Sequence, residues 1–331
     1  MKSALVKVID EKQFNNNNSS KVISAELLND NNCSKSNLEE LLNGFISFLD
    51  VSPRTVKAYH GAIRQLMTFF QSRNISQPLR KDIITYRRHL EERGLKPSTI
   101  HLYLVAIRRF FQWTEQTGLY PNIAANVKAP KQDAGHKKDY FAGEQIKSIL
   151  NNIDRSNIEG LRNYALLALM TTGGLRTIEA VRANVEDLQV VGGVSVLYIQ
   201  GKGRSDKKDF VKLTSEVETA IRTYLKTRGE VQDGEPLFAS QSKRNRGQRV
   251  TTRTISGICK KAMRLSGFNS KRLTAHSLRH TAVTLALMSG QTLEEVQHFA
   301  RHRNISTTQI YAHNLDRMNS QCEASIARAI F

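Results

Sequence analysis

The apolar positions between residues 36 and 118 recur at intervals of three and four residues, which is the spacing of amphipathic helices. Polar breaks divide this region into four stretches, each long enough for several helical turns. Helices joined by such short connections pack as a bundle, so we predict a small four-helix bundle here. The predicted helices cover about residues 36–49, 53–70, 81–92 and 97–118.

Local signals mark where these helices begin. Ser36 and Glu39 have the spacing of a capping box at the start of the first helix. Ser52 followed by Pro53 predicts the start of the second, because proline fits the first turn of a helix. Trp113 falls at helical spacing with other apolar residues, so we expect it in the core of the bundle.

The pattern between residues 141 and 331 is also mainly helical, but it contains a strand pair. Apolar and polar residues alternate in Val194–Ile199, which predicts one strand, and Asp209–Leu213 is predicted to pair with it as a second. The glycine-containing segment 201–206 predicts the turn between them. We therefore expect a mainly α domain with a small antiparallel sheet. Its predicted helices lie near residues 143–152, 159–172, 214–228, 251–265, 276–289, 292–300, 305–312 and 315–329, and a further helix carries Arg176 and Glu179.

Stretches without apolar periodicity set the expected domain boundaries. Residues 1–35 are rich in Asn and Ser and are expected to form a flexible N-terminal segment. Residues 119–140 combine prolines with a charged run, so they are expected to link the bundle (36–118) to the second domain (141–331). Within that domain, residues 315–331 carry an apolar stripe that predicts an interaction helix.

The chain of 331 residues is strongly basic, with 49 Lys and Arg against 30 Asp and Glu and a formal charge of +19. Both predicted domains share the excess. Residues 51–140 carry 16 basic and 6 acidic side chains, and residues 141–331 carry 28 and 17. Basic charge on two successive folded regions indicates a long polyanion that both contact. A general solubility charge is the alternative interpretation at this point.

Other features narrow the class of protein. The three cysteines show no pairing pattern, which favours a reducing compartment. No apolar run is long enough to cross a membrane, and the N-terminal residues lack the apolar core of a signal peptide. Zinc-type Cys and His spacings are absent, and no acidic metal cage lies near the candidate residues, so we expect no metal and no other cofactor. These features predict a cytoplasmic protein of a cell without a nucleus.

Arginines and histidines provide the first candidate site residues. His276, Arg279 and His280 share one face of a predicted helix, and a guanidinium is a planar fork that binds two phosphate oxygens. Arg176 follows a double glycine at a predicted helix start, where backbone N–H groups favour an anion. Glu179 lies one turn on and can hold that arginine. Taken singly, a solvated basic helix face and an ordinary Arg–Glu pair explain these residues equally well.

A lysine, two further histidines and a tyrosine complete the candidate set. Lys202 lies between two glycines in the predicted hairpin turn, where a lysine can donate a proton to a leaving oxygen. His302 precedes Tyr311 by nine residues, and His313 follows. A phenol, with a pKa near about 10, becomes a nucleophile when cations stabilise its anion and a histidine takes its proton. The alternatives are a polar hairpin tip for Lys202, a packed helix residue for Tyr311 and a surface imidazole for His313.

The joint order of these groups is far more specific than any one of them. Arg, then Lys in a hairpin, then His-x-x-Arg, then His, then Tyr nine residues later resembles the tyrosine recombinase (phage integrase) family. The upstream bundle resembles the core-binding, SAM-like domain of that family, and the likeness covers about residues 36–325. The family usually has Gly where this chain has Arg301, so the local loop is expected to differ. The matching segments are Gly174–Glu179, Gly201–Gly203, His276–His280, His302, Thr307–His313, Thr55–Tyr59 and Lys96–Ile100.

The resemblance implies an enzyme that cleaves and rejoins DNA strands. Tyr311 would attack a scissile phosphate and form a 3′-phosphotyrosyl link. Arg176 and Arg279 would stabilise charge on the non-bridging oxygens, and Lys202 would protonate the leaving 5′-oxygen. His276 would act as a base or hydrogen-bond donor.

The resemblance also implies the remaining site residues and the partners. His302 would hold the phosphate, and Glu179, His280 and His313 would support the catalytic groups. The protein would clamp duplex DNA and assemble as a tetramer on two recombination sites, with exchange of the C-terminal helix between subunits. The bundle residues expected to contact DNA are Arg64, Arg87, Arg88, Lys96, Arg108 and Arg109.

Several roles remain open at this point. Residues 1–35 are too short for a confident arm-binding domain, which favours a Xer-like resolvase or a compact transposon or plasmid recombinase over a larger integrase. An accessory or paired recombinase is compatible with either. A type IB topoisomerase shares the nucleophile, and a DNA-binding regulator could retain the scaffold without catalysis. The separate bundle argues against the topoisomerase, and the complete catalytic set argues against the regulator.

Overall fold

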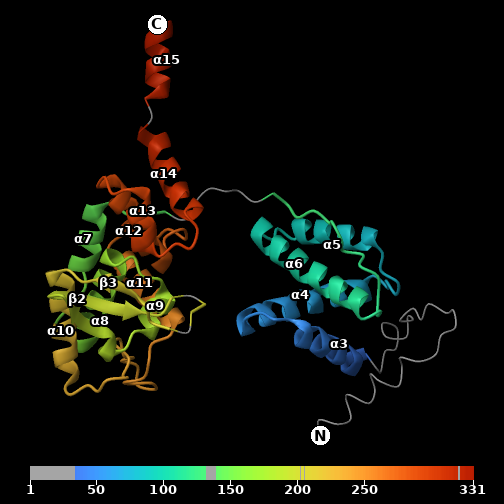
Figure 1. The fold of residues 1–331 in the computed structure, drawn as a ribbon, viewed down its shortest axis with the longest axis horizontal. Coiled ribbons are helices and arrows are strands. Elements are labelled where there is room, and N and C mark those ends of the chain that lie inside the picture. Colours follow the sequence, from blue (N-terminus) through green and yellow to red (C-terminus); the bar gives the residue numbers. More distant parts are fainter. Residues whose placement is uncertain (1–33, 132–138, 202, 205, 320) are drawn as a thin grey trace. The chain divides into compact units, whose positions relative to one another are not determined.

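The computed structural model describes residues 34–131, 139–201, 203–204, 206–319 and 321–331. The chain divides into two compact units, one within residues 1–134 and the other within residues 135–331 (Figure 1). The described residues are mostly helical, with one small antiparallel sheet in the second unit. This is the fold class that the sequence pattern predicts.

The described part of the first unit is a bundle of α3 (Ser34–Phe48), α4 (Pro53–Ser72), α5 (Arg80–Glu92) and α6 (Pro97–Gln116). Side chains from all of these helices fill one apolar core. Phe45 and Phe110 meet edge to face with ring centroids 5.4 Å apart. Trp113 is 7 % exposed and packs against both rings, which confirms its predicted place in the core.

The capping signals locate one of the two predicted helix starts. The hydroxyl of Ser52 accepts a hydrogen bond from the backbone N–H of Thr55 at 3.3 Å, and Pro53 occupies the first turn of α4. In contrast, α3 begins at Ser34, so Ser36 lies inside the helix and the predicted capping-box start was wrong. The two residues before Ser36 tolerate helical geometry, and a local signal alone does not prevent a helix from extending upstream.

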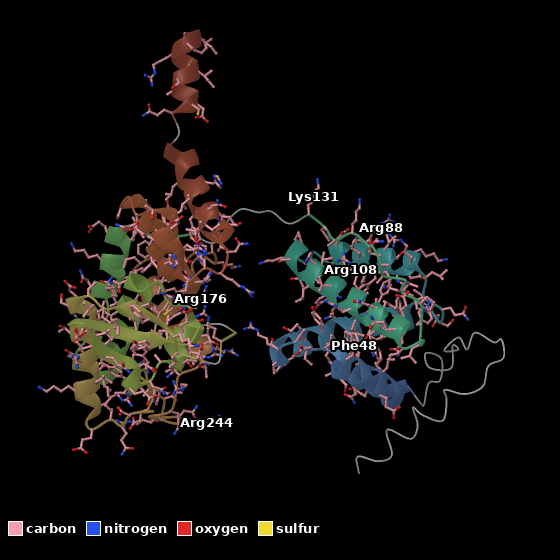
Figure 2. All side chains as sticks on the ribbon, in the orientation of Figure 1. Phe48, Arg88, Arg108, Lys131, Arg176 and Arg244 are labelled. Atoms are coloured by element: carbon pink, nitrogen blue, oxygen red, sulfur yellow. The ribbon has the colours of Figure 1, made fainter. Side chains whose placement is uncertain are left out.

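Two arginines of the bundle fix the course of the chain after α6. Nη1 of Arg87 donates a hydrogen bond to the carbonyl oxygen of Lys128 at 2.9 Å. Nη2 of Arg108 donates to the carbonyl oxygen of Val127, and Figure 2 labels this arginine on α6. Val127 is buried in the bundle core. The two side chains therefore stabilise the segment that leaves the bundle, a role that the sequence did not predict.

The second unit is organised around one helix, α8. Its bounds and those of the other helices are α7 (Gly143–Asn151), α8 (Ile158–Thr172), α9 (Thr177–Arg182), α10 (Ser215–Arg228), α11 (Thr252–Leu265), α12 (Ala275–Met288), α13 (Leu293–Ala300), α14 (Ser306–Asn319) and α15 (Cys322–Ile330), and a short 3₁₀ turn covers Val185–Asp187. α8 packs against α7, α9, α10 and α12 and is buried along most of its length. None of the helices in the described ranges is long and apolar enough to cross a lipid bilayer.

The sheet contains one strand more than predicted. Its order is β1 (Leu188–Val191), β2 (Val194–Ile199) and β3 (Asp209–Lys212), all antiparallel. β1 was missed because Val190 and Val191 are 61 % and 50 % exposed, so it lacks the alternation of a half-buried strand. The available signal was the turn: Gly192 and Gly193 have φ of 57° and 78°, the left-handed conformation of a tight hairpin.

The C-terminal helices divide differently from the prediction. α14 continues without a break from Ser306 to Asn319, whereas the pattern predicted a break after residue 312. No proline or glycine lies between residues 312 and 315, so nothing interrupts the backbone hydrogen bonds there. On α15, Ile326 and Ile330 are 58 % and 67 % exposed and Phe331 is fully exposed. These apolar side chains lie uncovered by the described part of the chain.

Gly160, in the first turn of α8, should not tolerate a side chain. A Cβ there would lie 1.6 Å from the carbonyl oxygen of Asp154, so Gly160→Ala forces the backbone to move. We expect the free energy of unfolding of the second unit to fall by roughly 3 kcal/mol or more. The matched control is Gly257→Ala in α11, where nothing lies within 4 Å of an added Cβ. It should raise stability by up to about 1 kcal/mol. Urea unfolding measures both, and equal effects would contradict the packing described here.

Candidate active site

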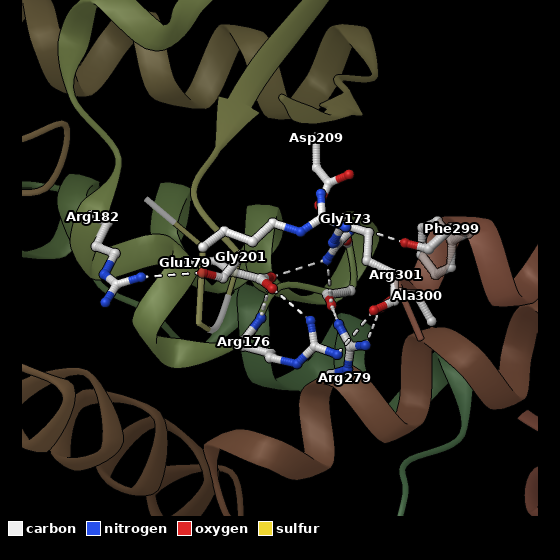
Figure 3. A network of polar contacts seen from close by, with 12 residues as sticks. Gly173, Arg176, Glu179, Arg182, Gly201, Asp209, Arg279, Phe299, Ala300 and Arg301 are labelled. Carbon is white, nitrogen blue, oxygen red and sulfur yellow. Dashed lines mark hydrogen bonds and ion pairs between the residues drawn. The ribbon is translucent and has the colours of Figure 1, made fainter. Parts of the chain in front are cut away.

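Residues far apart in the sequence meet beside α12. Arg176 lies directly before α9, Arg279 lies on α12 and Tyr311 lies on α14. α12 packs against α8, α13 and α14. Figure 3 shows the polar network that joins the turn between α8 and α9 to the end of α13.

Arg176 makes a paired contact with Glu179. Its backbone N–H donates to Oε2 of Glu179 at 2.8 Å, and its Nη1 donates to Oε1 at 2.6 Å (Figure 3). Its Nη2 donates to the carbonyl oxygen of Arg301 at 3.2 Å. The Arg176 side chain is 26 % exposed, while that of Glu179 is fully buried. The carboxylate therefore fixes the guanidinium at the start of α9 and leaves part of it accessible.

Arg279 lies deeper and is 1 % exposed. Its Nη1 donates to the carbonyl oxygen of Gly174 at 2.5 Å, and its Nη2 donates to that of Ala300. Burial lowers the pKa of Arg279 to about 9, and the positive charges of Arg176 and Arg301 act in the same direction. The guanidinium is still charged at neutral pH, but its charge is poorly compensated. Such a group favours a bound anion.

Arg301 belongs to the same cluster, although the sequence marked it only as a departure from the family pattern. It ends α13 with φ 54° and ψ 45°, in the left-handed region. Its guanidinium donates to the carbonyl oxygens of Phe299 at 2.6 Å and Gly174 at 3.0 Å, and to Oε2 of Glu179 at 3.1 Å. The signal in the sequence was an arginine at a position where the family usually has glycine. Because this side chain is nearly buried, its charge requires hydrogen-bond acceptors close by.

Glu179 is the carboxylate around which these arginines gather. Burial alone would raise its pKa, but Arg301 and Arg176 together hold the pKa of Glu179 below its ordinary value. The carboxylate is therefore ionised at neutral pH. One negative charge faces the three guanidiniums of Arg176, Arg279 and Arg301. The surplus of positive charge in a poorly solvated place is suited to an anion such as a phosphodiester.

A row of rings lies next to the arginines. The rings of His276 and His280 meet edge to face with centroids 4.9 Å apart, and His280 lies 5.1 Å from Tyr311. Tyr311 stacks on His302 at 6.0 Å. His302 is oriented in turn by Thr308, whose hydroxyl oxygen lies 2.9 Å from Nδ1. His276 is exposed, whereas His280 and Tyr311 are each 5 % exposed, so one end of the row reaches solvent.

The phenol of Tyr311 is protonated at neutral pH in this arrangement. Burial raises the pKa of Tyr311 above its ordinary value, and Arg279 and Arg176 oppose that shift without cancelling it. A phenol becomes a good nucleophile only when a base takes its proton or cations approach it. The rings of His280 and His302 and the guanidiniums of Arg279 and Arg176 lie near Tyr311 and are groups of these two kinds.

A cleft of about 590 Å³ opens beside the cluster and gives a ligand access to it. Arg176 and His302 line it, together with Gly201 and Gly203 of the turn between β2 and β3. Gly203 has φ of 79°, which glycine adopts readily. Lys202, between these glycines, lies outside the described residues. Across the described ranges, no group of three or more metal-binding side chains occurs.

The structure brings most of the sequence candidates together. The residues that meet are Arg176, Glu179, His276, Arg279, His280, His302 and Tyr311. His313 lies apart: it is exposed on α14, and two residues beyond Tyr311 correspond to a rotation of roughly 200° around the helix. That spacing turns His313 away from the rings.

The bundle residues selected as DNA contacts have different environments. Arg88, Lys96 and Arg109 are exposed, and Figure 2 shows Arg88 projecting from α5. Arg64 is also exposed, but it forms an ion pair with Glu39 at 2.7 Å. Arg87 and Arg108, which bond to the segment after α6, are partly buried. The exposed residues are the ones free to meet a phosphate without a change in the bundle.

Clustered arginines beside a tyrosine and several histidines, in a basic and mainly helical chain, are the features of an enzyme that transfers phosphoryl groups through a covalent link. The Phage integrase family matches residues 139–318, and the N-terminal SAM-like domain of phage integrases matches residues 40–119. Because the first match alone covers more than half of the chain, the chain belongs to the phage integrase family. It is thus a tyrosine recombinase, an enzyme that cleaves and rejoins DNA strands.

Relatives and a solved structure agree with this assignment. The chain is 29 % identical over 285 residues to the tyrosine recombinase XerD of Listeria innocua, with 81 % of this chain and 92 % of that protein covered. It is 30 % identical over 281 residues to the tyrosine recombinase XerC of Herpetosiphon aurantiacus, with 81 % and 89 % covered. The post-cleavage complex of the site-specific recombinase XerH with a palindromic difH substrate has the same fold. Its TM-score is 0.71 at 22 % identity, with 89 % of this chain and 85 % of that chain covered.

Proposed function

We propose that this protein is a site-specific recombinase that exchanges strands between two DNA sites through a 3′-phosphotyrosyl intermediate. The observation that carries the proposal is the convergence of Arg176, Arg279 and Tyr311, which lie close enough for both guanidiniums to act on the pKa of the phenol. A phosphate bound between them would meet a nucleophile and two charge-stabilising groups at once.

Tyr311 is the proposed nucleophile. Its phenol oxygen bonds to the scissile phosphorus while the bond from phosphorus to the 5′-oxygen breaks, which leaves a 3′-phosphotyrosyl link and a free 5′-hydroxyl. The phenol proton passes to the histidine row, in which His276 is the base or hydrogen-bond donor and His280 supports it. Lys202, between two glycines that line the cleft, gives its proton to the departing 5′-oxygen.

Arg176 and Arg279 stabilise the phosphate during this step. The non-bridging oxygens carry more negative charge in the transition state than in the ground state, so the surplus positive charge around Glu179 stabilises the transition state more. His302, whose Nδ1 lies 2.9 Å from the hydroxyl oxygen of Thr308 and which lines the cleft, is proposed to hold a phosphate oxygen. The guanidiniums thus supply the charge stabilisation that a metal ion provides in other phosphoryl transfers.

Strand exchange follows by reversal of the same chemistry. The 5′-hydroxyl of the partner strand attacks the phosphotyrosyl link and releases Tyr311, so the bond energy is retained and no ATP is needed. One exchange forms a Holliday junction, and a second exchange resolves it. Four strands must be cut at two sites, which four copies of this chain can do as a closed tetramer.

Both units are proposed to contact duplex DNA. The exposed Arg88, Lys96 and Arg109 on the bundle and the basic cleft of the second unit provide the phosphate contacts. The similar XerH structure contains a DNA substrate, which supports this assignment. His313, exposed beyond Tyr311, is assigned no part in proton transfer.

Resolution of chromosome or plasmid dimers in the bacterial cytoplasm, at the nucleoid, is the biological role we favour. The two relatives described above are Xer recombinases, and both align over most of their own length. Integration or excision of a mobile element uses the same chemistry and differs in the DNA sites that are joined.

Tyr311→Phe tests the nucleophile. The ring remains and the hydroxyl is lost, so the variant should bind its DNA site like the wild type but form no covalent complex on a nicked suicide substrate. Tyr140→Phe removes a 47 % exposed phenol from the same unit and should react at the wild-type rate. Denaturing gels measure the complex. A wild-type level of complex with Tyr311→Phe would exclude this nucleophile, and supercoil relaxation without exchange between two sites would indicate a topoisomerase.

Lys202→Ala tests the general acid. Cleavage should slow by roughly 100-fold or more, because the 5′-oxygen must leave without a proton. A substrate with sulfur at the 5′-bridging position needs little protonation and should restore cleavage to near the wild-type rate. Lys208→Ala, an exposed lysine of the same hairpin, should have little effect on either substrate. Failure of sulfur to rescue Lys202→Ala would show that this lysine is not the acid.

α15 is proposed to dock on a neighbouring subunit of the tetramer. Ile326, Ile330 and Phe331 form an apolar face that the described part of this chain does not cover. An amphipathic helix with an exposed apolar face is suited to burial against a second copy. Such an exchange would couple the position of α14, and with it Tyr311, to the adjacent subunit.

Ile326→Glu tests this exchange against Ser325→Glu, which adds the same charge at the adjacent position. Because both side chains are exposed in the single chain, neither variant should lose solubility or single-site DNA binding. Ile326→Glu should impair assembly on two sites, measured by native gels, while Ser325→Glu should not. Equal assembly by the two variants would refute the exchange, and loss of folded protein would indicate that α15 docks on its own subunit.

A further inference from the structure

Three successive carbonyl groups at the end of α13 each accept a hydrogen bond from an arginine. The carbonyl oxygen of Phe299 accepts from Arg301, that of Ala300 from Arg279, and that of Arg301 from Arg176. These arginines come from three different elements (Figure 3). The conformation of this turn therefore determines where the guanidiniums of Arg176 and Arg279 lie.

The turn depends on a strained residue. Arg301 has φ 54°, a conformation that costs a residue with a Cβ about 1–2 kcal/mol and costs glycine nothing. The strain is offset by the side chain, which is 9 % exposed and bonded to the carbonyl oxygens of Gly173 and Gly174 and to Glu179. Glycine would relax the backbone but would remove all of these bonds.

We propose that Arg301 is a positioning residue that ties the turn carrying Arg176 to the turn that accepts Arg279, and so holds both guanidiniums at the scissile phosphate. This inference rests on the proposed role of Arg176 and Arg279 as the phosphate clamp. It assigns to this chain a third arginine that acts through the other two.

The hydrogen-bond inventory separates Arg301 from the arginines it positions. A guanidinium has four Nη hydrogens, and those of Arg301 are directed at Gly173, Gly174, Phe299 and Glu179. Its Nε has no hydrogen-bond partner but is buried, and although Arg301 borders the cleft its side chain is only 9 % exposed, so a phosphate could reach this donor only if the side chain moved and its Nη bonds broke. Arg176 is bonded at each Nη but is 26 % exposed in the cleft. Arg176 is therefore the residue that can turn a donor towards DNA.

Arg301 also controls the charge of Glu179. Its proximity is the largest influence that lowers the pKa of this buried carboxyl, and burial acts against it. Without Arg301, the pKa of Glu179 would rise from its lowered value, because only the contacts with Arg176 would still oppose burial. Below the raised pKa the carboxyl would be protonated and would release Arg176. Loss of Arg301 should therefore reduce activity most at acidic pH and least at alkaline pH.

The test compares Arg301→Gly, Arg301→Met and Arg301→Lys in the full chain. Single-turnover cleavage is measured on preformed complexes with a suicide substrate across a pH series, alongside DNA affinity. Arg301→Gly and Arg301→Met should cleave roughly 10–100-fold more slowly, the usual result of misplaced catalytic groups, with DNA affinity little changed. Arg301→Lys should fall between them and the wild type, because one ammonium retains the charge but cannot bond four acceptors.

The pH series provides the readout that a merely structural role would not change. The cleavage rate of Arg301→Met should fall towards acidic pH through a range in which the wild type is constant. Asn74→Gly is the backbone control, since Asn74 has φ 52° in the other unit and gains the same relief from glycine. It should cleave at the wild-type rate. If Arg301→Gly fails to fold, Arg301→Met carries the pH test, and Arg301→Lys, which retains the charge, should show less of the acidic fall.

Three results would overturn the inference. Wild-type cleavage by Arg301→Met would show that the arginine is dispensable. A slower rate that is constant across the pH series would remove the connection through Glu179. A loss of DNA affinity as large as the loss of rate would show that Arg301 contacts DNA directly. By contrast, wild-type cleavage by Arg176→Ala and Arg279→Ala would contradict the proposed function itself, which distinguishes the two failures.

Discussion

The candidate active site depends on one buried carboxylate surrounded by guanidiniums. Glu179 is fully buried, and it remains ionised because Arg301 and Arg176 outweigh the effect of burial. A buried charge is tolerated only when it is paired and hydrogen-bonded, and both oxygens of Glu179 are. The same carboxylate fixes Arg176 at the start of α9. If Glu179 were neutral, the cluster would lose the ion pairs that fix its geometry and that offset the repulsion between its arginines.

The positive surplus of the cluster links stability to function. Arg279 is buried among carbonyl oxygens with its pKa lowered, which is an unfavourable place for a cation without an anion. A phosphate would relieve this repulsion, so the proximity of like charges is expected to favour the proposed DNA complex. The chemistry we propose uses that surplus again when charge builds on the phosphate oxygens. Burial raises the pKa of Tyr311, so the proposed nucleophile is protonated at neutral pH and requires a base before it can attack.

In the bundle, some basic side chains bond to the backbone and others are exposed to solvent. Arg87 and Arg108 are committed to backbone carbonyls of the segment after α6, whereas Arg88 and Arg109 extend into solvent. The composition of the chain does not separate these groups, since all four are arginines on amphipathic helices. Their partners do, and only the exposed pair contributes to a surface that attracts phosphate without changing the fold.

The sequence by itself determined the fold class, the bundle, the strand pair and the order of the candidate catalytic groups. The elements follow from local patterns such as apolar spacing and the Ser52–Pro53 cap, whereas the candidate site follows from the joint order of short motifs between residues 174 and 313. The tertiary structure decided what no local pattern contains. It brought Arg176 to the carbonyl of a residue 125 positions later, buried Arg279 and gave Arg301 its partners. Those outcomes depend on how α12, α13 and α14 pack. Packing depends on contacts between segments that are distant in the sequence, and local residue spacing does not predict such contacts.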